Sequence, residues 1–212
     1  MQLQRPFAVI TPTVDGDVLA VLAGADTAFT SGDVTRLAAA EWSRSGVRKS
    51  LDRLVRQGIV DVSRVGAGYG FKLNRDHLAA QHIVALANLR SALVQKVASE
   101  LASAPQEPVW AAMFGSAARG DMSAVSDIDI FLVPGHHADM DAWADWSTRF
   151  SSTISRWTGN DVRLLEMTES EVAAGAASDD PILTSIANDA VPLFGSSTWL
   201  RRQLKRHRAN PR

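Results

Sequence analysis

Asp127 and Asp129 flank Ile128 at the start of an apolar run that continues to Val133. The run predicts a β-strand, and alternation along a strand places both carboxylates on one face. Ionised carboxylates beside a core need a partner, because their desolvation costs several kcal/mol each. Mg²⁺ is the partner we expect, because it prefers oxygen ligands and is commonly held by one or two carboxylates together with substrate phosphates. The pattern therefore predicts phosphoryl-transfer chemistry.

A Gly-Ser pair, Gly115-Ser116, directly follows another apolar run, at 108–114. Glycine lets the backbone approach a phosphate, N–H groups in a tight turn form an anion site, and the Ser116 hydroxyl adds a donor. Ten residues, 117–126, separate this turn from Asp127. We therefore expect a phosphate-binding turn and two metal ligands on neighbouring strands, which together would hold a nucleoside triphosphate and Mg²⁺.

The stretch GSAARGDMSAVSDIDIFLV resembles the signature of the DNA polymerase beta-like nucleotidyltransferase superfamily, and most closely that of its minimal nucleotidyltransferases. The resemblance implies Mg²⁺-dependent transfer of a nucleoside monophosphate, with AMP from ATP expected, to a hydroxyl of a protein, a tRNA end or a small molecule. It also permits a toxin–antitoxin role in which a HEPN-domain partner is modified. Asp127 and Asp129 would be catalytic metal ligands. The matching positions implied to bind nucleotide are Gly115, Ser116, Arg119 and Ser126, and Gly120 and Asp121 also match.

The third carboxylate of the superfamily has no direct counterpart in this chain. The resemblance places it on the next strand, and counting from Gly159 that position holds Arg163. Glu166 and Asp161 are the nearby acids. Glu166 lies between apolar residues, where an ionised carboxylate is unusual unless it has a function or a partner. Strand alternation, however, places Asp161, and not Glu166, on the face of Arg163. We take Glu166 as the third catalytic residue, and Asp161 or no third acid remain alternatives.

A second function follows from that missing acid. In the superfamily the third acid acts as base on the attacking hydroxyl, so its loss would reduce chemistry and leave nucleotide binding in place. The competing hypothesis is therefore a transcription regulator whose second domain binds nucleotide without turnover. The intact Gly-Ser turn and aspartate pair favour the enzyme, and Arg163 favours the regulator.

Charge is unevenly distributed along the 212 residues, although the formal net charge is only −1. Residues 43–75 contain eight basic and two acidic side chains, whereas residues 104–192 contain fourteen acidic and four basic ones. The stretch 199–212 adds six basic residues and no acid. Such asymmetry predicts a nucleic-acid-facing segment joined to an acidic domain.

The basic first segment has the order helix, helix, helix, hairpin. Apolar spacing predicts helices after Thr13, after Thr30 or Ser31, and over 43–57, followed by a hairpin around three glycines at 66–70. This order is that of a winged helix-turn-helix and is similar to regulators of the multiple-antibiotic-resistance type. Binding to a protein is the alternative to binding DNA. The residues expected to contact nucleic acid are Ser45, Arg48, Lys49 and Arg53 on the third helix and Arg64 near the hairpin tip.

The rest of the chain predicts an α+β fold in three parts. Residues 1–78 form the winged helix-turn-helix, 79–104 form one long connecting helix, and 105–212 form a nucleotidyltransferase domain with a small mixed sheet. Pro105 and Pro108 end the connecting helix. Strands are expected over 108–114, 126–133, 161–167 and 191–195. Helices are expected over 138–159, after Thr168 with Glu171 in capping-box spacing, from Pro181, and in the basic tail.

Several classes of protein are excluded or disfavoured by composition. The absence of Cys excludes disulfides, a Cys-ligated zinc ion and a thiol nucleophile. No apolar run approaches the roughly 20 residues that span a bilayer, and no signal-peptide pattern begins the chain, so we expect a cytoplasmic protein without membrane contact. The adjacent His136 and His137 are expected to be loop residues rather than a metal pair. Whether the chain is a monomer or a homodimer stays open.

Overall fold

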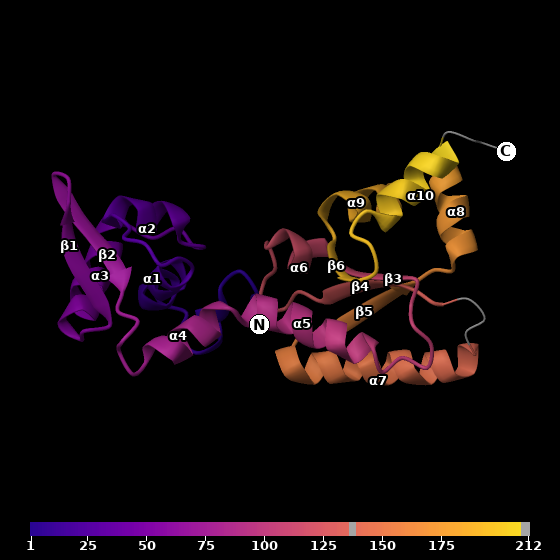
Figure 1. The fold of residues 1–212 in the computed structure, drawn as a ribbon, viewed down its shortest axis with the longest axis horizontal. Coiled ribbons are helices and arrows are strands. Elements are labelled where there is room, and N and C mark those ends of the chain that lie inside the picture. Colours follow the sequence, from indigo (N-terminus) through magenta and orange to yellow (C-terminus); the bar gives the residue numbers. More distant parts are fainter. Residues whose placement is uncertain (136–138, 209–212) are drawn as a thin grey trace. The chain divides into compact units, whose positions relative to one another are not determined.

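The computed structural model describes residues 1–135 and 139–208, and these form two compact units (Figure 1). The first unit comprises Gln2–Ala92, and the second begins at Leu93 and includes Met1. Helices and a small mixed sheet make this an α+β protein, as predicted. No helix among the described residues is long and apolar enough to cross a membrane. His136 and His137 lie outside the described residues.

Helices and one hairpin make up the first unit. Its elements are η1 (Pro6–Val9), α1 (Val14–Ala23), α2 (Ser31–Leu37), α3 (Arg44–Arg56), β1 (Val60–Val65), β2 (Gly68–Leu73) and α4 (Ala80–Ala87). The predicted order of three helices and a hairpin is therefore present. Val18 and Leu22 of α1 pack with Leu51 and Leu54 of α3 in one core. Each such side chain contributes roughly 1.5–3 kcal/mol when fully buried.

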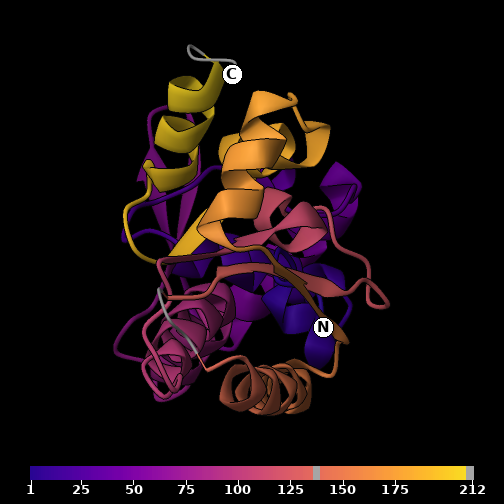
Figure 2. The same ribbon diagram turned by 90° about the vertical axis from the view of Figure 1, so that its right-hand side faces the viewer.

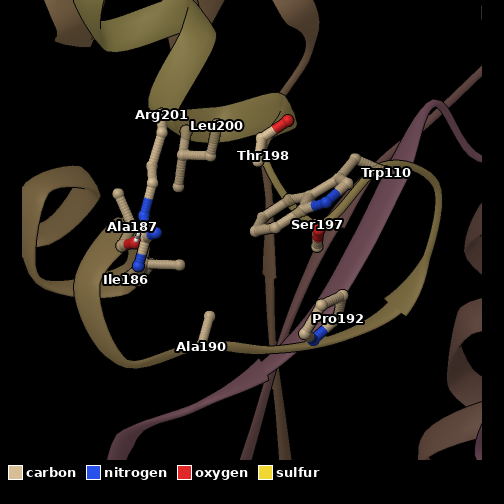
Figure 3. Close-up of a pocket in the computed structure, with 9 residues that line it drawn as sticks. All are labelled: Trp110, Ile186, Ala187, Ala190, Pro192, Ser197, Thr198, Leu200 and Arg201. Atoms are coloured by element: carbon tan, nitrogen blue, oxygen red, sulfur yellow. Dashed lines mark hydrogen bonds between the residues drawn. The ribbon is translucent and has the colours of Figure 1, made fainter.

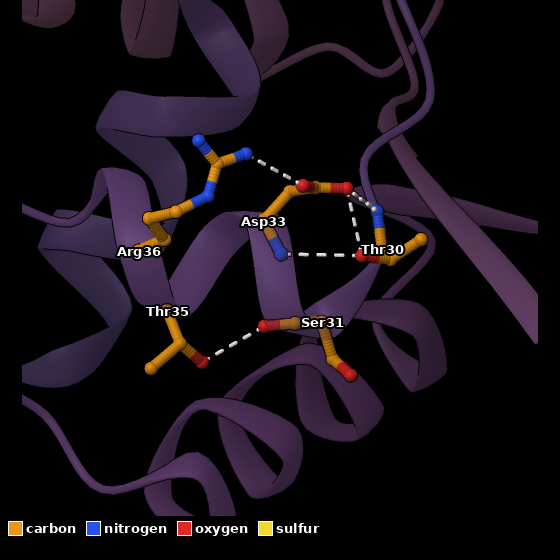
Figure 4. A network of polar contacts seen from close by, with 5 residues as sticks. All are labelled: Thr30, Ser31, Asp33, Thr35 and Arg36. Atoms are coloured by element: carbon orange, nitrogen blue, oxygen red, sulfur yellow. Dashed lines mark hydrogen bonds and ion pairs between the residues drawn. The ribbon is translucent and has the colours of Figure 1, made fainter.

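The start of α2 is fixed by a capping box at Thr30 (Figure 4). The backbone N–H of Asp33 donates to Thr30 Oγ1 at 3.1 Å, and Asp33 Oδ2 accepts from the Thr30 N–H at 3.1 Å. Thr30 is therefore the N-cap, which decides between the two candidates, Thr30 and Ser31. Hydrogen bonds from Thr30 and from Arg36, 2.8 Å away, lower the pKa of the Asp33 carboxyl.

The hairpin of β1 and β2 is joined by a third extended segment. The two strands pair antiparallel from Val60 opposite Leu73 to Val65 opposite Gly68, and Gly66 at the tip has φ +59°. Phe29, between α1 and α2, exchanges backbone hydrogen bonds of 2.9 and 2.8 Å with Phe71. The hairpin is therefore anchored to the helices through the backbone as well as through the core.

The prediction of a single connecting helix over 79–104 is wrong. The structure has two helices there, α4 and α5 (Leu89–Leu101), separated at Asn88. Ile83 of α4 packs into the core of the first unit, whereas Leu93 and Val97 of α5 are buried as part of the second unit. The helix ends at Asn88, which readily leaves helical geometry. The two units therefore divide at Ala92–Leu93, and not at the later prolines.

The second unit is a four-stranded mixed sheet with helices on both faces. Its further elements are β3 (Trp110–Phe114), α6 (Gly115–Arg119), β4 (Ile128–Val133), α7 (Met140–Thr158), β5 (Val162–Glu166), α8 (Glu169–Ala177), α9 (Pro181–Asp189), β6 (Val191–Phe194) and α10 (Trp199–Arg208). The strand order is β5-β4-β3-β6, and only β4 and β5 are parallel. Helices α5 and α7 cover one face, and α6, α8, α9 and α10 cover the other (Figures 1 and 2).

Strand β4 carries a different set of side chains to each face. Phe131 and Val133 pack in one cluster with residues of α8, α9 and α10, including Val172, Leu183 and Leu200. Alternation along the strand places Asp129 on this same face, beyond the end of the apolar cluster. The core of the second unit therefore fixes the direction in which the aspartates point.

Candidate functional site

Asp127 and Asp129 lie at the N-terminal end of β4, where the sheet meets α6. Asp127 immediately precedes the strand, and Asp129 pairs with Phe114 on β3 and with Arg163 on β5. The carboxylate of Asp129 lies against Gly115, the first residue of α6, whose φ is +67°. A side chain at Gly115 would overlap Asp129 Oδ2. The glycine turn and the second aspartate therefore adjoin each other.

The expected Gly-Ser turn is the start of a one-turn helix, α6. Gly120, with φ +79°, ends this helix, and the Ser116 carbonyl oxygen accepts from the N–H groups of Gly120 at 2.9 Å and Asp121 at 3.2 Å. The Ser116 side chain is half-buried. The left-handed glycines at both ends fix the path of the chain, because other residues rarely adopt this conformation.

The electrostatics around Asp129 favour a bound cation. Burial raises the pKa of the Asp129 carboxyl, the neighbouring Asp127 charge raises it further, and Arg163 and Arg119 partly offset these effects. The Asp129 carboxylate makes no hydrogen bond or ion pair with residues 1–135 or 139–208. A divalent cation stabilises the ionised form of a carboxylate whose pKa is raised in this way, and Asp127 beside Asp129 supplies a second oxygen donor.

Asp127 already has a cationic partner in the protein. Arg163 Nη2 lies 2.8 Å from Asp127 Oδ2. Residue 163, where the resemblance implied a third acid, therefore carries a guanidinium that neutralises one member of the aspartate pair.

Arg119 and Ser126 both lie near the aspartates, but their side chains have local partners. Arg119 Nε lies 3.2 Å from Asp121 Oδ2, while its charge still lowers the pKa of Asp129. Ser126 Oγ accepts from the Ser123 N–H at 2.8 Å and contacts Ser123 Oγ at 3.0 Å. Ser126 thus stabilises the loop that leads into Asp127.

Asn160 also shapes the site, and sequence reasoning missed it. It is only 4% exposed, and its Nδ2 donates to the carbonyl oxygens of Ser126 at 2.9 Å and Ala124 at 3.4 Å. These bonds tie the loop before Asp127 to the residue that follows the C-cap of α7. The available signal was an Asn directly after the left-handed Gly159, where a buried polar side chain needs partners.

The structure does not bring Glu166 to the aspartates, so the catalytic role expected for it does not hold. Glu166 pairs with Leu132, which places it on the opposite face of the sheet, and its Oε2 accepts from Trp143 Nε1 at 2.9 Å. Asp161 immediately precedes β5 and shares the face of Arg163 by alternation. In the described part of the chain, no three Asp, Glu, His or Cys side chains are grouped as a metal site.

Two cavities lie beside the helices α6, α9 and α10 that cover one face of the sheet. A cavity of about 170 Å³ lies beside the start of α6, lined by Gly115 and Arg119 and, on α9, by Ser185 and Asp189. A second cavity of about 190 Å³ lies between the Trp110 ring, Pro192 and α10, where Arg201 Nε donates to the Ala187 carbonyl at 2.7 Å (Figure 3). Only the first cavity adjoins the aspartates through Gly115.

The basic residues of α3 and β1 that are expected to contact nucleic acid differ in whether an acidic side chain neutralises them. Arg48 Nε lies 3.1 Å from Asp52 Oδ1, and Arg53 pairs with Asp15. Lys49 and Arg64 are exposed and form no ion pair with any described residue. Ser45, at the start of α3, contacts the N-cap Ser43 through their hydroxyls at 3.2 Å.

Residues 94–160 match the nucleotidyltransferase domain family. The matching range runs from α5 to Asn160 and contains Gly115, Asp127 and Asp129. No curated protein matches the chain.

Four solved structures are similar to part of the chain, among them the following three. One is a toxin–antitoxin complex with AMP-PNP (16% identity, 55% of this chain and 84% of that chain, TM-score 0.40). Another is the toxin–antitoxin complex MntA–HepT (14%, 56% and 84%, TM-score 0.37). The third is a tri-AMPylated Shewanella oneidensis HEPN toxin in complex with MNT antitoxin (14%, 57% and 84%, TM-score 0.39). Similarity of this extent does not bear on function.

Proposed function

We propose that the second unit transfers a nucleoside monophosphate, with AMP expected, from a nucleoside triphosphate to an acceptor hydroxyl. The observation that carries the proposal is the contact between Asp129 and Gly115, within a range that matches the nucleotidyltransferase domain family. This contact joins a glycine turn suited to phosphate with an acid suited to a cation. Asp127 adds a second carboxylate at the same edge of the sheet.

The donor set fits Mg²⁺. Asp127 and Asp129 would hold the ion, which when bound neutralises phosphate charge and polarises the reacting phosphoryl group. Gly115 and Ser116 would contact the phosphates, and Arg119 lies close enough to add positive charge. Asp161 replaces Glu166 as the acid we propose to accept the proton of the attacking hydroxyl, because it shares the face of the aspartates.

We further propose that the first unit is a winged helix-turn-helix that binds nucleic acid. The element order and the pairing of Phe29 with Phe71 beside the hairpin support this part of the proposal. Helix α3 would enter the major groove and the hairpin tip would contact phosphate or the minor groove. The proposed contacts are Ser45, Arg48, Lys49, Arg53 and Arg64.

A regulator that binds nucleotide without turnover is the second candidate, and Arg163 favours it. A guanidinium stands where a third acid is expected, and it pairs with Asp127. A protein, a tRNA end and a small molecule all remain acceptors of the proposed enzyme, including the protein partner of a toxin–antitoxin pair.

The enzyme and the regulator are distinguished by whether the protein releases pyrophosphate from ATP and transfers the label to an acceptor. The full chain is incubated with α-labelled ATP, Mg²⁺ and either tRNA, a protein mixture or an aminoglycoside. We expect transfer that falls about a thousandfold in Asp129→Asn, since a lost cation site removes several kcal/mol of transition-state stabilisation. Asp145→Asn, on the exposed side of α7, removes the same charge and should leave transfer unchanged. Tight ATP binding without label transfer would instead support the regulator.

A further inference from the structure

Arg163 lies beside both aspartates and contacts one of them. It is the β5 partner of Asp129 in the parallel register, and its Nη2 lies 2.8 Å from Asp127 Oδ2. The Arg163 side chain is 75% exposed, whereas that of Asp127 is 24% exposed. The ion pair therefore joins a sheltered acid to a long side chain that has room to move.

A divalent cation and the Arg163 guanidinium compete for the same carboxylate. Both are attracted to the Asp127 oxygens, and two positive charges a few ångströms apart repel each other. The arginine end of this ion pair is mostly exposed to water, which keeps its contribution to folding stability small, so Arg163 can leave Asp127 without loss of the fold. The exchange requires another acceptor for the guanidinium.

A triphosphate in the proposed site supplies that acceptor. Guanidinium binds phosphate oxygens in the same forked geometry with which it binds carboxylates. We propose that Arg163 exchanges partners: it holds Asp127 while the site contains no nucleotide, and it transfers to the triphosphate as the nucleotide binds, which frees Asp127 for the cation. This inference rests on the proposed nucleotide site. It makes Arg163 a positioning residue that couples cation binding to nucleotide binding.

Two binding measurements on the full chain test the exchange. Mn²⁺ serves as the probe for the cation without nucleotide, followed by electron paramagnetic resonance. ATP serves as the probe for the triphosphate in EDTA, followed by calorimetry. Arg163→Ala should bind Mn²⁺ roughly tenfold more tightly, because a competing charge is removed, and should bind metal-free ATP roughly threefold to tenfold more weakly. A merely structural role would weaken both.

Matched variants keep the test specific. Arg163→Gln should change both affinities in the same directions. Arg149→Ala removes an exposed arginine from α7, on the other side of the sheet, and should change neither. Asp127→Asn in the Arg163→Ala background should abolish the gain in Mn²⁺ affinity.

The outcomes separate this inference from the proposed function. If Asp127→Asn weakens Mn²⁺ binding in the wild-type background but Arg163→Ala does not strengthen it, the exchange is overturned and the cation site stands. If neither Asp127→Asn nor Asp129→Asn affects Mn²⁺ binding in any background, the proposed function fails together with the exchange.

Discussion

The Asp129 carboxylate on β4 occupies the space in which a side chain at Gly115 on α6 would lie. Two independent features therefore demand glycine at this position: a φ of +67° and the approach of Oδ2. Because Asp129 pairs with Phe114, the residue before Gly115, the strand register itself sets this approach. The C-terminal end of β3 and the N-terminal end of β4 therefore pack closely against each other through Gly115 and Asp129.

Gly115→Ala should abolish nucleotidyl transfer and lower the free energy of unfolding by about 2 kcal/mol or more. Left-handed backbone costs a non-glycine residue roughly 1–2 kcal/mol, and the overlap with Asp129 adds to it. Gly159→Ala is the matched control, because Gly159 has φ +72° but no atom within 4 Å of an added Cβ. Chemical denaturation and label transfer measure the two effects. Equal losses of stability, with transfer retained in Gly115→Ala, would show that the contact with Asp129 is unimportant.

The placement of Asp127 and Asp129 on one face of the sheet could be predicted from the sequence, because it depends only on the alternation of side chains along a strand. The same rule placed Glu166 away from Asp129, and the apolar setting of Glu166 suggested a catalytic reason for an acid where the reason is a hydrogen bond from Trp143. That partner lies 23 residues away in the sequence. The two carbonyls that Asn160 holds are 34 and 36 residues away, so only the folded chain brings these groups together.

Glu166→Ala should retain transfer within about twofold and lower the free energy of unfolding by about 1–3 kcal/mol, the usual cost of leaving a buried donor without its acceptor. The Trp143 side chain is fully buried, so its indole N–H has no access to water. Glu166→Gln keeps an acceptor oxygen and should lose less stability. A hundredfold loss of transfer in Glu166→Gln, with the fold intact, would restore Glu166 as a catalytic residue.

The stability of the protein without metal should depend on the ionisation of Asp129. Burial and the Asp127 charge raise the pKa of Asp129 in the folded state above its unfolded value of about 4. The folded state thus binds this proton more tightly, so the stabilisation is present below the unfolded pKa and is lost as the pH rises through the folded pKa. In EDTA, Asp129→Asn should therefore melt at a higher temperature than the wild type at pH 7, and the difference should shrink toward pH 4. A difference that grows on acidification would contradict the raised pKa.

Nucleic-acid binding by the first unit should depend most on Lys49 and Arg64, which have no acidic partner among the described residues. Lys49→Ala with Arg64→Ala should weaken binding to duplex DNA and reduce the slope of log affinity against log salt by about 0.9 per lost phosphate contact. Arg53→Ala should have a smaller effect, because Arg53 is paired with Asp15. Fluorescence anisotropy between about 50 and 200 mM salt measures both quantities. An unchanged slope in the double variant would exclude this surface.

Asp127 and Asp129, beside Gly115, form the proposed site for a cation and a triphosphate. A crystal structure with Mn²⁺ and a non-hydrolysable ATP analogue, with the ion located by anomalous scattering, would show whether they do. We expect an Mn²⁺ peak in contact with both carboxylates, phosphates beside Gly115 and Ser116, and Arg163 moved from Asp127 to a phosphate oxygen. Nucleotide bound elsewhere, or both carboxylates without an ion while Arg163 still holds Asp127, would contradict the proposal.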